Sequence, residues 1–239
     1  MDGKTTRFFG MWLIRGILPL LVCWSGPLQA ATVKARLVLL DKGNVASGSK
    51  NVPPSVLWLK PTHPDPSFVL PPGKFSLLQK NKMFSPHLLV VPVGSNVSFP
   101  NADPFFHNAF SLFDGKRFDL GLYEAGSMRS VVFSREGVSY IFCNIHPEMS
   151  AVVLALTTPF YSVADAAGNF QIAAVPSGEY ELHVWIEGGQ PTALNELTRR
   201  VRITNDSTDL GDIRSGTQKE QPHLNKFGRP YEPESKPVY

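Results

Sequence analysis

Residues 143–149 concentrate side chains that could bind a soft metal ion. Cys143, His146 and Met149 are spaced as C-x2-H-x2-M, and His107 lies upstream of them. A thiolate and a thioether select a soft or borderline metal, and imidazole nitrogens suit copper. Two histidines, one cysteine and a weak axial methionine form the ligand set of copper sites that transfer electrons. The spacing therefore predicts one type 1 (blue) copper ion, bound by these four residues.

The ligand loop is short enough to surround one ion. Residues 138–142 are aromatic and β-branched, which predicts a strand that ends at Cys143. Pro147 then predicts a turn. An extended chain spans at most about 3.6 Å per residue, so each three-residue step of the loop covers at most about 11 Å. His107 must come from another strand, and the site therefore depends on the tertiary fold.

Other chemistries explain these residues less well. A single buried cysteine or histidine is usually structural. A catalytic Cys-His pair would leave Met149 without a role, and no orienting Asn or Asp is identifiable. Because protein ligands fill the predicted site, we expect electron transfer and no enzymatic activity. The remaining histidines lack a partner pattern and are predicted to be structural or surface residues: His63, His87, His183 and His223.

Residues 1–30 are predicted to be a secretory signal peptide. Three basic residues precede an apolar stretch at residues 16–24, and Ala30 offers a small residue before the cleavage point. This pattern predicts export to the periplasm, with no membrane span after cleavage. Leu28, at the position three residues before the cut, leaves an uncleaved membrane anchor as the alternative.

Cleavage would also change the cysteine count and the charge. Cys143 would be the only cysteine left, and an unpaired thiol in an oxidising compartment is a liability unless a metal occupies it. Without residues 1–30 the chain has 20 basic and 19 acidic residues. This near-neutral balance argues against nucleic acid or an acidic membrane as a partner.

The composition predicts an all-β chain. It contains 21 prolines and 19 glycines, short β-branched runs and no long stretch of 3.6-residue period. Roughly 180 ordered residues suffice for two small β-sandwiches. Seven prolines fall between residues 53 and 72, and residues 61–74 are predicted to be a linker.

Residues 75–157 carry the pattern of a known copper fold. The segment from Phe99 to Asn108 fits F-x-N-x-D-x-x-x-H-N, with Asn101, Asp103 and His107 at the fixed positions, and V-P-V-G precedes it. The segment resembles a small cupredoxin of the plastocyanin and amicyanin type. This resemblance implies a Greek-key β-sandwich in which Asn108 ties the first-ligand strand to the cysteine loop. An ordinary turn-capping role for this Asn is the alternative.

A second pattern follows at residues 159–203. Fixed positions of D-A-x-G-x-F and V-P-x-G-x-Y are filled, at the residues Asp165, Gly168, Phe170, Val175, Pro176, Gly178 and Tyr180. This segment resembles the carboxypeptidase regulatory-like (transthyretin-like, carbohydrate-binding-like) β-sandwich. That module opens with two further strands, which residues 32–61 could supply before residues 158–213 complete it. The cupredoxin-like segment would then be an insertion, at a closure cost of only about 2 kcal/mol for a tenfold longer loop.

The function predicted from these features is that of a periplasmic electron carrier, followed by a disordered tail at residues 214–239. The pair of modules resembles methylamine-utilisation-like proteins, which implies a dehydrogenase or cytochrome as redox partner. One alternative is an exported module that binds glycan or a partner through exposed Trp185 or Tyr161. Another is a copper carrier, although the chain has five methionines and no repeated Met or His motif.

Overall fold

The computed structural model describes residues 30–41, 44–45, 52–63, 65–112, 115–204, 206–216 and 223–231. Apart from Ala30, the predicted signal peptide lies outside these residues. The prediction of an all-β fold is confirmed: in the described ranges, one α-helix, α1 (Pro191–Glu196), and one 3-10 turn, η1 (Pro66–Phe68), accompany the strands. None of the helices in the described ranges has the length and apolarity needed to cross a membrane.

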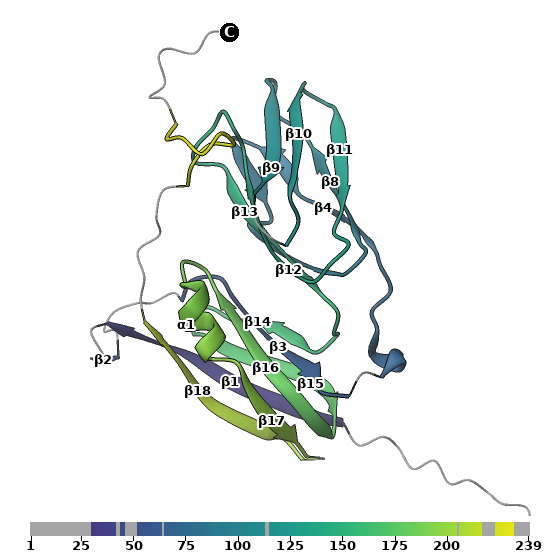
Figure 1. Cartoon of the computed structure of the whole chain (residues 1–239), viewed down its shortest axis with the longest axis vertical. Helices are drawn as coiled ribbons and strands as arrows, with labels where there is room; N and C mark the ends of the chain where they lie inside the picture. Colours follow the sequence, from purple (N-terminus) through teal and green to yellow (C-terminus); the bar gives the residue numbers. More distant parts are fainter. Residues whose placement is uncertain are drawn as a thin grey trace, which may run out of the picture.

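The strands gather in two β-sandwiches, one above the other in Figure 1. The lower one, here named the split sandwich, takes strands from both ends of the chain. Its first sheet has the order β15-β1-β18 with β2 paired to β1, and its second has the order β14-β3-β16-β17. Its strands are β1 (Ala30–Asp41), β2 (Asn44–Val45), β3 (Ser55–Pro61), β14 (Tyr161–Val163), β15 (Asn169–Pro176), β16 (Gly178–Ile186), β17 (Arg199–Ile203) and β18 (Thr208–Gly216).

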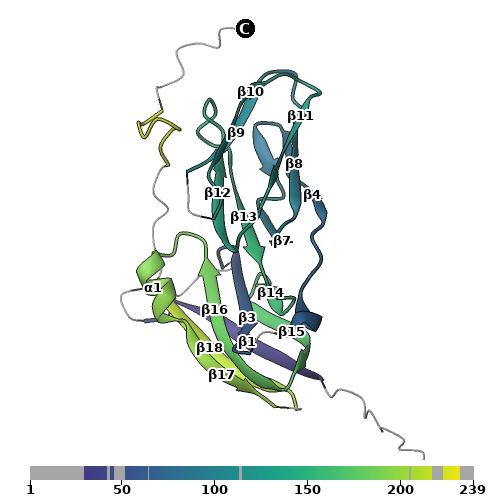
Figure 2. The ribbon, with the colours of Figure 1, turned by 45° about the vertical axis from the view of Figure 1, so that its right-hand side comes forward.

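The upper body, here named the insert sandwich, is formed by the chain between β3 and β14 (Figure 2). A five-stranded sheet of order β10-β9-β12-β13-β7 accompanies a three-stranded sheet of order β11-β8-β4 and a β5-β6 hairpin. Its strands are β4 (Lys74–Ser76), β5 (Leu78–Lys80), β6 (Met83–Ser85), β7 (Leu88–Pro92), β8 (Asn96–Pro100), β9 (His107–Ser111), β10 (Phe118–Tyr123), β11 (Met128–Val132), β12 (Gly137–Phe142) and β13 (Ser150–Leu156).

Strand pairing explains how one sandwich can interrupt the other. β1 pairs antiparallel with β15 and parallel with β18, while β3 pairs with β14 and β16. The entry and exit points of the insert lie side by side, because Leu59 N–H donates to Phe160 O at 2.8 Å. The closure entropy of the long connection is therefore small. Membership of the split sandwich in the regulatory-like family stays a prediction.

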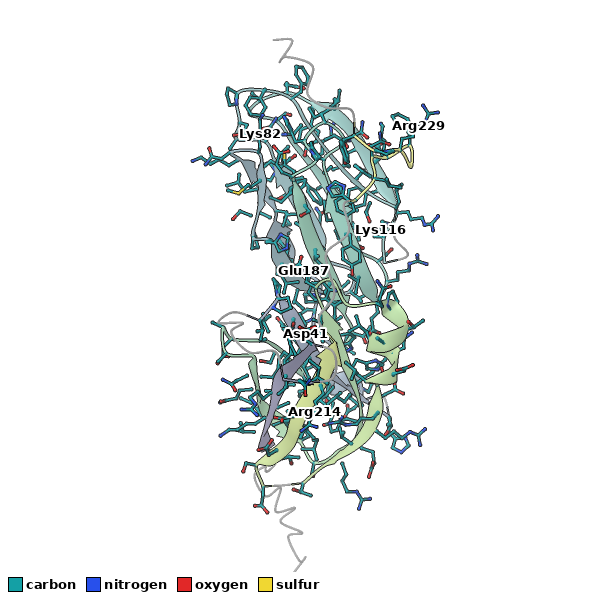
Figure 3. The ribbon with its side chains drawn as sticks, turned by 90° about the vertical axis from the view of Figure 1, so that its left-hand side faces the viewer. Asp41, Lys82, Lys116, Glu187, Arg214 and Arg229 are labelled. Carbon is teal, nitrogen blue, oxygen red and sulfur yellow. The ribbon has the colours of Figure 1, made fainter. Side chains whose placement is uncertain are left out.

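β13 joins the two cores. Successive residues of a strand face opposite sides, so Ala151, Val153 and Ala155 pack in the insert core while Val152 and its alternate neighbours pack in the split core. Burial on both faces accounts for the unbroken apolar sequence of this strand. Polar contacts flank the shared face. Trp185 Nε1–H donates to the Tyr140 hydroxyl at 3.1 Å, and Glu187, labelled between the two bodies in Figure 3, contacts His87 at 2.5 Å.

Two parts of the fold differ from the sequence prediction. The three glycines between residues 113 and 127 predict a long irregular connection there, yet this segment contains the edge strand β10. Its alternation is broken by a register shift between Asp119 and Leu122, with Gly121 at φ +67°. The sequence also predicts one strand over residues 75–79, but these residues are divided between β4 and β5, the first strand of the β5-β6 hairpin.

The C-terminal region also differs from the predicted disorder. Residues 214–216 continue β18, because Arg214 to Gly216 extend its parallel pairing with β1. Residues 223–231 form a turn that lies against the insert sandwich, as the hydrogen bonds described below show. Polar and proline-rich composition did not reveal this order, because the contacts are made with residues far away in the chain.

Candidate metal centre

The structure brings three of the predicted ligands together. His107 opens β9, Cys143 follows the last residue of β12, and His146 lies in the loop before β13. The Cys143 Sγ atom lies 3.9 Å from His107 Nδ1 and 3.6 Å from His146 Nδ1, and the two nitrogens are 3.1 Å apart. All three side chains are buried, His107 and Cys143 completely.

The size of this triangle suits one metal ion. The circle through the three atoms has a radius of about 2.1 Å, close to the roughly 2.0–2.3 Å of metal–nitrogen and metal–sulfur bonds. Within the described part of the chain, this is the one group of His, Cys and acidic residues close enough together to hold a metal. One thiolate and two imidazoles are a soft donor set that favours copper. The group His107, Cys143 and His146 therefore fits a single copper ion.

A carboxylate fixes the ring of His107. The Asp103 Oδ2 atom accepts a hydrogen bond from His107 Nε2 at 2.8 Å, which leaves Nδ1 directed at the other ligands. The backbone N–H groups of Asn81 and Lys82 donate to the same carboxylate at 2.6 and 2.9 Å. Burial raises the pKa of Asp103, but the hydrogen bonds from Lys82, His107 and Asn81 outweigh it and lower the pKa overall. An ionised partner of this kind orients a ligating histidine and increases its basicity.

The environment of Cys143 suits a thiolate once a cation is present. Burial raises the pKa of the Cys143 thiol, so the metal-free side chain is held in its neutral form. The backbone amides of Ile145, Asn108 and His146 act in the opposite direction, because they hydrogen-bond to the sulfur. Metal binding is therefore expected to release the thiol proton to solvent and to leave a thiolate that these backbone donors stabilise.

Met149 is placed at the end of the same loop. Its side chain is fully buried in the insert core. Cys143 N–H donates to Met149 O at 3.3 Å, and Met149 N–H donates to His146 O at 3.1 Å. These bonds close the loop on itself. An axial role for the thioether sulfur stays a prediction.

Asn108 makes the connection that the cupredoxin resemblance implied. Its Oδ1 atom accepts a hydrogen bond from Asn144 N–H at 3.3 Å, which links β9 to the residue after Cys143. Its Nδ2 group donates to Asp119 Oδ1 at 2.8 Å and to Gly121 O at 3.0 Å. The first-ligand strand, β10 and the cysteine loop are thus held together by one amide side chain.

Sequence reasoning missed some of the groups that surround the ligands. Phe105 lies against both imidazoles, with ring centroids 5.2 Å from His107 and 5.6 Å from His146. The expectation that no Asn or Asp orients these histidines was wrong, because Asp103 accepts a hydrogen bond from His107 Nε2. His223 was expected to be a structural or surface residue, yet its ring stacks on Phe142 beside the site. No local pattern marks His223, because its partners lie far away in the sequence.

The other histidines do not join the ligand group. His87 bonds to Glu187 and to the backbone, and His183 stacks on Trp58 at 5.2 Å. His63 lies on the surface. These positions agree with the structural and surface roles that the sequence predicted for them.

Comparison with known proteins gives partial similarities. No protein-family model matches the chain, and no curated protein matches it. A purple cupredoxin from Nitrosopumilus maritimus is similar over 34% of this chain and 98% of its own, with 27% identity and a TM-score of 0.31. A copper-containing nitrite reductase from Thermus scotoductus is similar over 36% of this chain and 23% of its own, with 24% identity and a TM-score of 0.34. Amicyanin from Paracoccus versutus is similar over 36% and 85%, with 18% identity and a TM-score of 0.32.

Proposed function

We propose that the protein is an exported electron carrier that holds one type 1 copper ion through His107, Cys143 and His146, with Met149 as a weak axial ligand. The single observation that carries this proposal is the buried triangle of one sulfur and two nitrogens. Its three atoms are spaced so that one ion between them would lie at metal–ligand bond distances from each. When bound, copper supplies a one-electron couple between Cu(II) and Cu(I). The protein side chains supply fixed geometry and exclude water.

Each part of the site serves that purpose. Asp103 holds the His107 ring, and backbone amides stabilise the charge of the Cys143 thiolate. Phe105 covers the imidazoles and limits solvent access, which influences the potential of a metal site. Because the three ligand side chains are buried and held by the protein, we infer that the site transfers electrons and does not turn over a substrate.

We infer that electrons pass at the end of the insert sandwich near His146. Ile145 and Phe106, each next to a ligand histidine in the chain, are apolar and are 40% and 54% exposed. Exposed apolar residues of this kind suit brief contact with another redox protein. A periplasmic dehydrogenase or cytochrome is the proposed partner class, by the resemblance to methylamine-utilisation-like proteins.

The alternative functions receive less support. Trp185, one of the two aromatics proposed for glycan binding, is 3% exposed and hydrogen-bonded at the junction of the sandwiches. Tyr161 is partly buried in β14. A copper carrier would need to release its ion, whereas the donor atoms here lie in the interior of the insert sandwich.

The test is to add Cu(II) to the purified chain and to measure the visible absorption. We expect an intense thiolate-to-copper band that ascorbate bleaches by one-electron reduction and that a chemical oxidant restores. Cys143→Ser should abolish the band, while His87→Gln, a histidine outside the ligand group, should preserve it. The proposal fails if the wild-type chain gives no band, or if the band survives in Cys143→Ser.

Met149→Leu tests the axial ligand separately. Loss of a weak thioether ligand should leave copper bound, keep the visible band and raise the reduction potential. Voltammetry of the two proteins measures the difference. Complete loss of copper from Met149→Leu, or an unchanged potential, would show that this residue is not a weak axial ligand.

A further inference from the structure

Residues 223–231, here named the C-terminal clasp, lie against the ligand loop (the yellow segment in Figures 1 and 2). The Tyr231 hydroxyl donates to the carbonyl oxygen of Cys143 at 2.8 Å. At the other side of the loop, His223 Nε2–H donates to the carbonyl oxygen of Pro147 at 2.6 Å. The clasp therefore grips the main chain on both sides of His146.

Lys226 adds a third contact, which closes a separate ring of hydrogen bonds. Lys226 N–H donates to Asn144 Oδ1 at 3.0 Å, and Lys226 Nζ donates to Asp119 Oδ2 at 2.8 Å. Asp119 Oδ1 accepts from Asn108, whose own Oδ1 accepts from Asn144 N–H. The ring passes through the clasp, β10, β9 and the cysteine loop in turn. Movement of the loop would break it.

The clasp is itself well defined. Asn225 Oδ1 accepts hydrogen bonds from the N–H groups of Phe227 and Arg229 at 3.0 and 3.1 Å, and Asn225 N–H donates to Arg229 O at 2.9 Å. Gly228 takes φ +72°, which the turn requires. This turn presents the Lys226 backbone to the loop.

Ring stacking adds a contact at the base of the site. The His223 ring lies 3.9 Å from that of Phe142 with an interplanar angle of 20°, and Tyr231 meets the same imidazole edge-on at 5.2 Å. Phe142 directly precedes Cys143 in the chain. The clasp therefore reaches side chains as well as the backbone next to the sulfur ligand.

We propose that the C-terminal clasp is a positioning element of the copper centre, a role that rests on the proposed electron-carrier function. By holding the carbonyls of Cys143 and Pro147, it keeps the loop in ligand geometry in both oxidation states. Ligands that are locked by surrounding contacts move little when the charge on a metal changes. The clasp follows the split sandwich in the chain, because β18 ends at Gly216, seven residues before His223.

The experiment compares full-length Tyr231→Phe and Lys226→Met with wild type and with Tyr161→Phe, a matched control on β14. In the metal-free proteins, hydrogen exchange of the backbone amides of residues 144–149 should become about fivefold faster in each clasp variant, as expected for the loss of one hydrogen bond. With copper bound, release to a chelator should accelerate to a similar extent, and the thiolate-to-copper band should shift. Tyr161→Phe should match wild type in all three measurements.

Two outcomes would overturn the positioning role of the clasp, and a third would overturn the electron-carrier function. Unchanged exchange, release and band in both clasp variants would overturn the proposal. Faster exchange without any change in release or in the band would show a structural contact only, and would also overturn the positioning role. If wild type itself gives no copper band while the exchange differences appear, the electron-carrier function fails and the contact of the clasp with the loop stands.

Discussion

The two sandwiches are built alike but use their interiors differently. The core of the split sandwich joins apolar side chains such as Leu59, Leu182 and Phe170. The interior of the insert sandwich also encloses ionisable and amide side chains, among them Asp103, His107 and Asn108. Buried polar groups are costly unless they are hydrogen-bonded. Asp103, His107 and Asn108 are all hydrogen-bonded and lie together beside the cysteine loop, which marks where the fold serves chemistry as well as stability.

The largest expected difference between the two sandwiches is the stabilisation of the insert sandwich by copper. At free copper a thousandfold above the dissociation constant, we expect the free energy of unfolding to rise by about 4 kcal/mol, because the ion binds the assembled ligand group and not the unfolded chain. A denaturant titration, with unfolding detected by hydrogen exchange of the β12 amides, measures the gain in the free energy of unfolding. Cys143→Ser should show no such gain. An equal gain in that variant would mean that copper binds elsewhere.

A cavity in the split core tests whether the copper site is independent of it. Leu59 is fully buried, so Leu59→Ala should lower the free energy of unfolding by about 3.5 kcal/mol. The folded protein should retain the copper band at an unchanged wavelength. Leu122→Ala, at a residue that is 54% exposed on β10, serves as the control and should cost at most about 0.5 kcal/mol. A shifted band in folded Leu59→Ala would contradict the independence of the copper site from the split core.

Alkaline pH should destabilise the insert sandwich through Tyr123. Burial raises the pKa of Tyr123 to about 12 from its usual 10, and its hydroxyl donates to Phe99 O at 3.0 Å. Because the folded-state pKa is the higher one, the stabilisation is complete below pH 10 and is lost as the pH rises from 10 to 12. The loss amounts to about 3 kcal/mol.

Denaturant midpoints measured between pH 9 and 12 check this loss. Tyr123→Phe should remove this part of the pH dependence, and Tyr161→Phe on the split sandwich should retain it. Equal pH profiles for wild type and Tyr123→Phe would show that another group controls alkaline unfolding.

The sequence predicted the ligand group better than it predicted what holds the group in place. The C-x2-H-x2-M spacing is local, so Cys143 and His146 could be assigned from chemistry, and the aromatic and β-branched residues at 138–142 predicted the strand before them. β10 escaped detection because a glycine at positive φ interrupts its alternation. The clasp escaped because Tyr231 and Cys143 are 88 residues apart and are joined by a side-chain hydrogen bond. Contacts of this kind leave no periodic trace in the sequence.

The smallest expected effect concerns the ion pair between Lys60 and Glu136, which joins the split and insert sandwiches. Lys60 Nζ lies 2.8 Å from Glu136 Oε2, and the two side chains are 45% and 24% exposed. Water screens such a pair, so a double-mutant cycle of Lys60→Met and Glu136→Gln should give a coupling of only about 0.5 kcal/mol that falls with added salt. The apolar face of β13 would then be what joins the two bodies. A coupling above about 2 kcal/mol that persists in salt would assign the junction to this ion pair, and the two sandwiches would be linked by charge more than by a shared core.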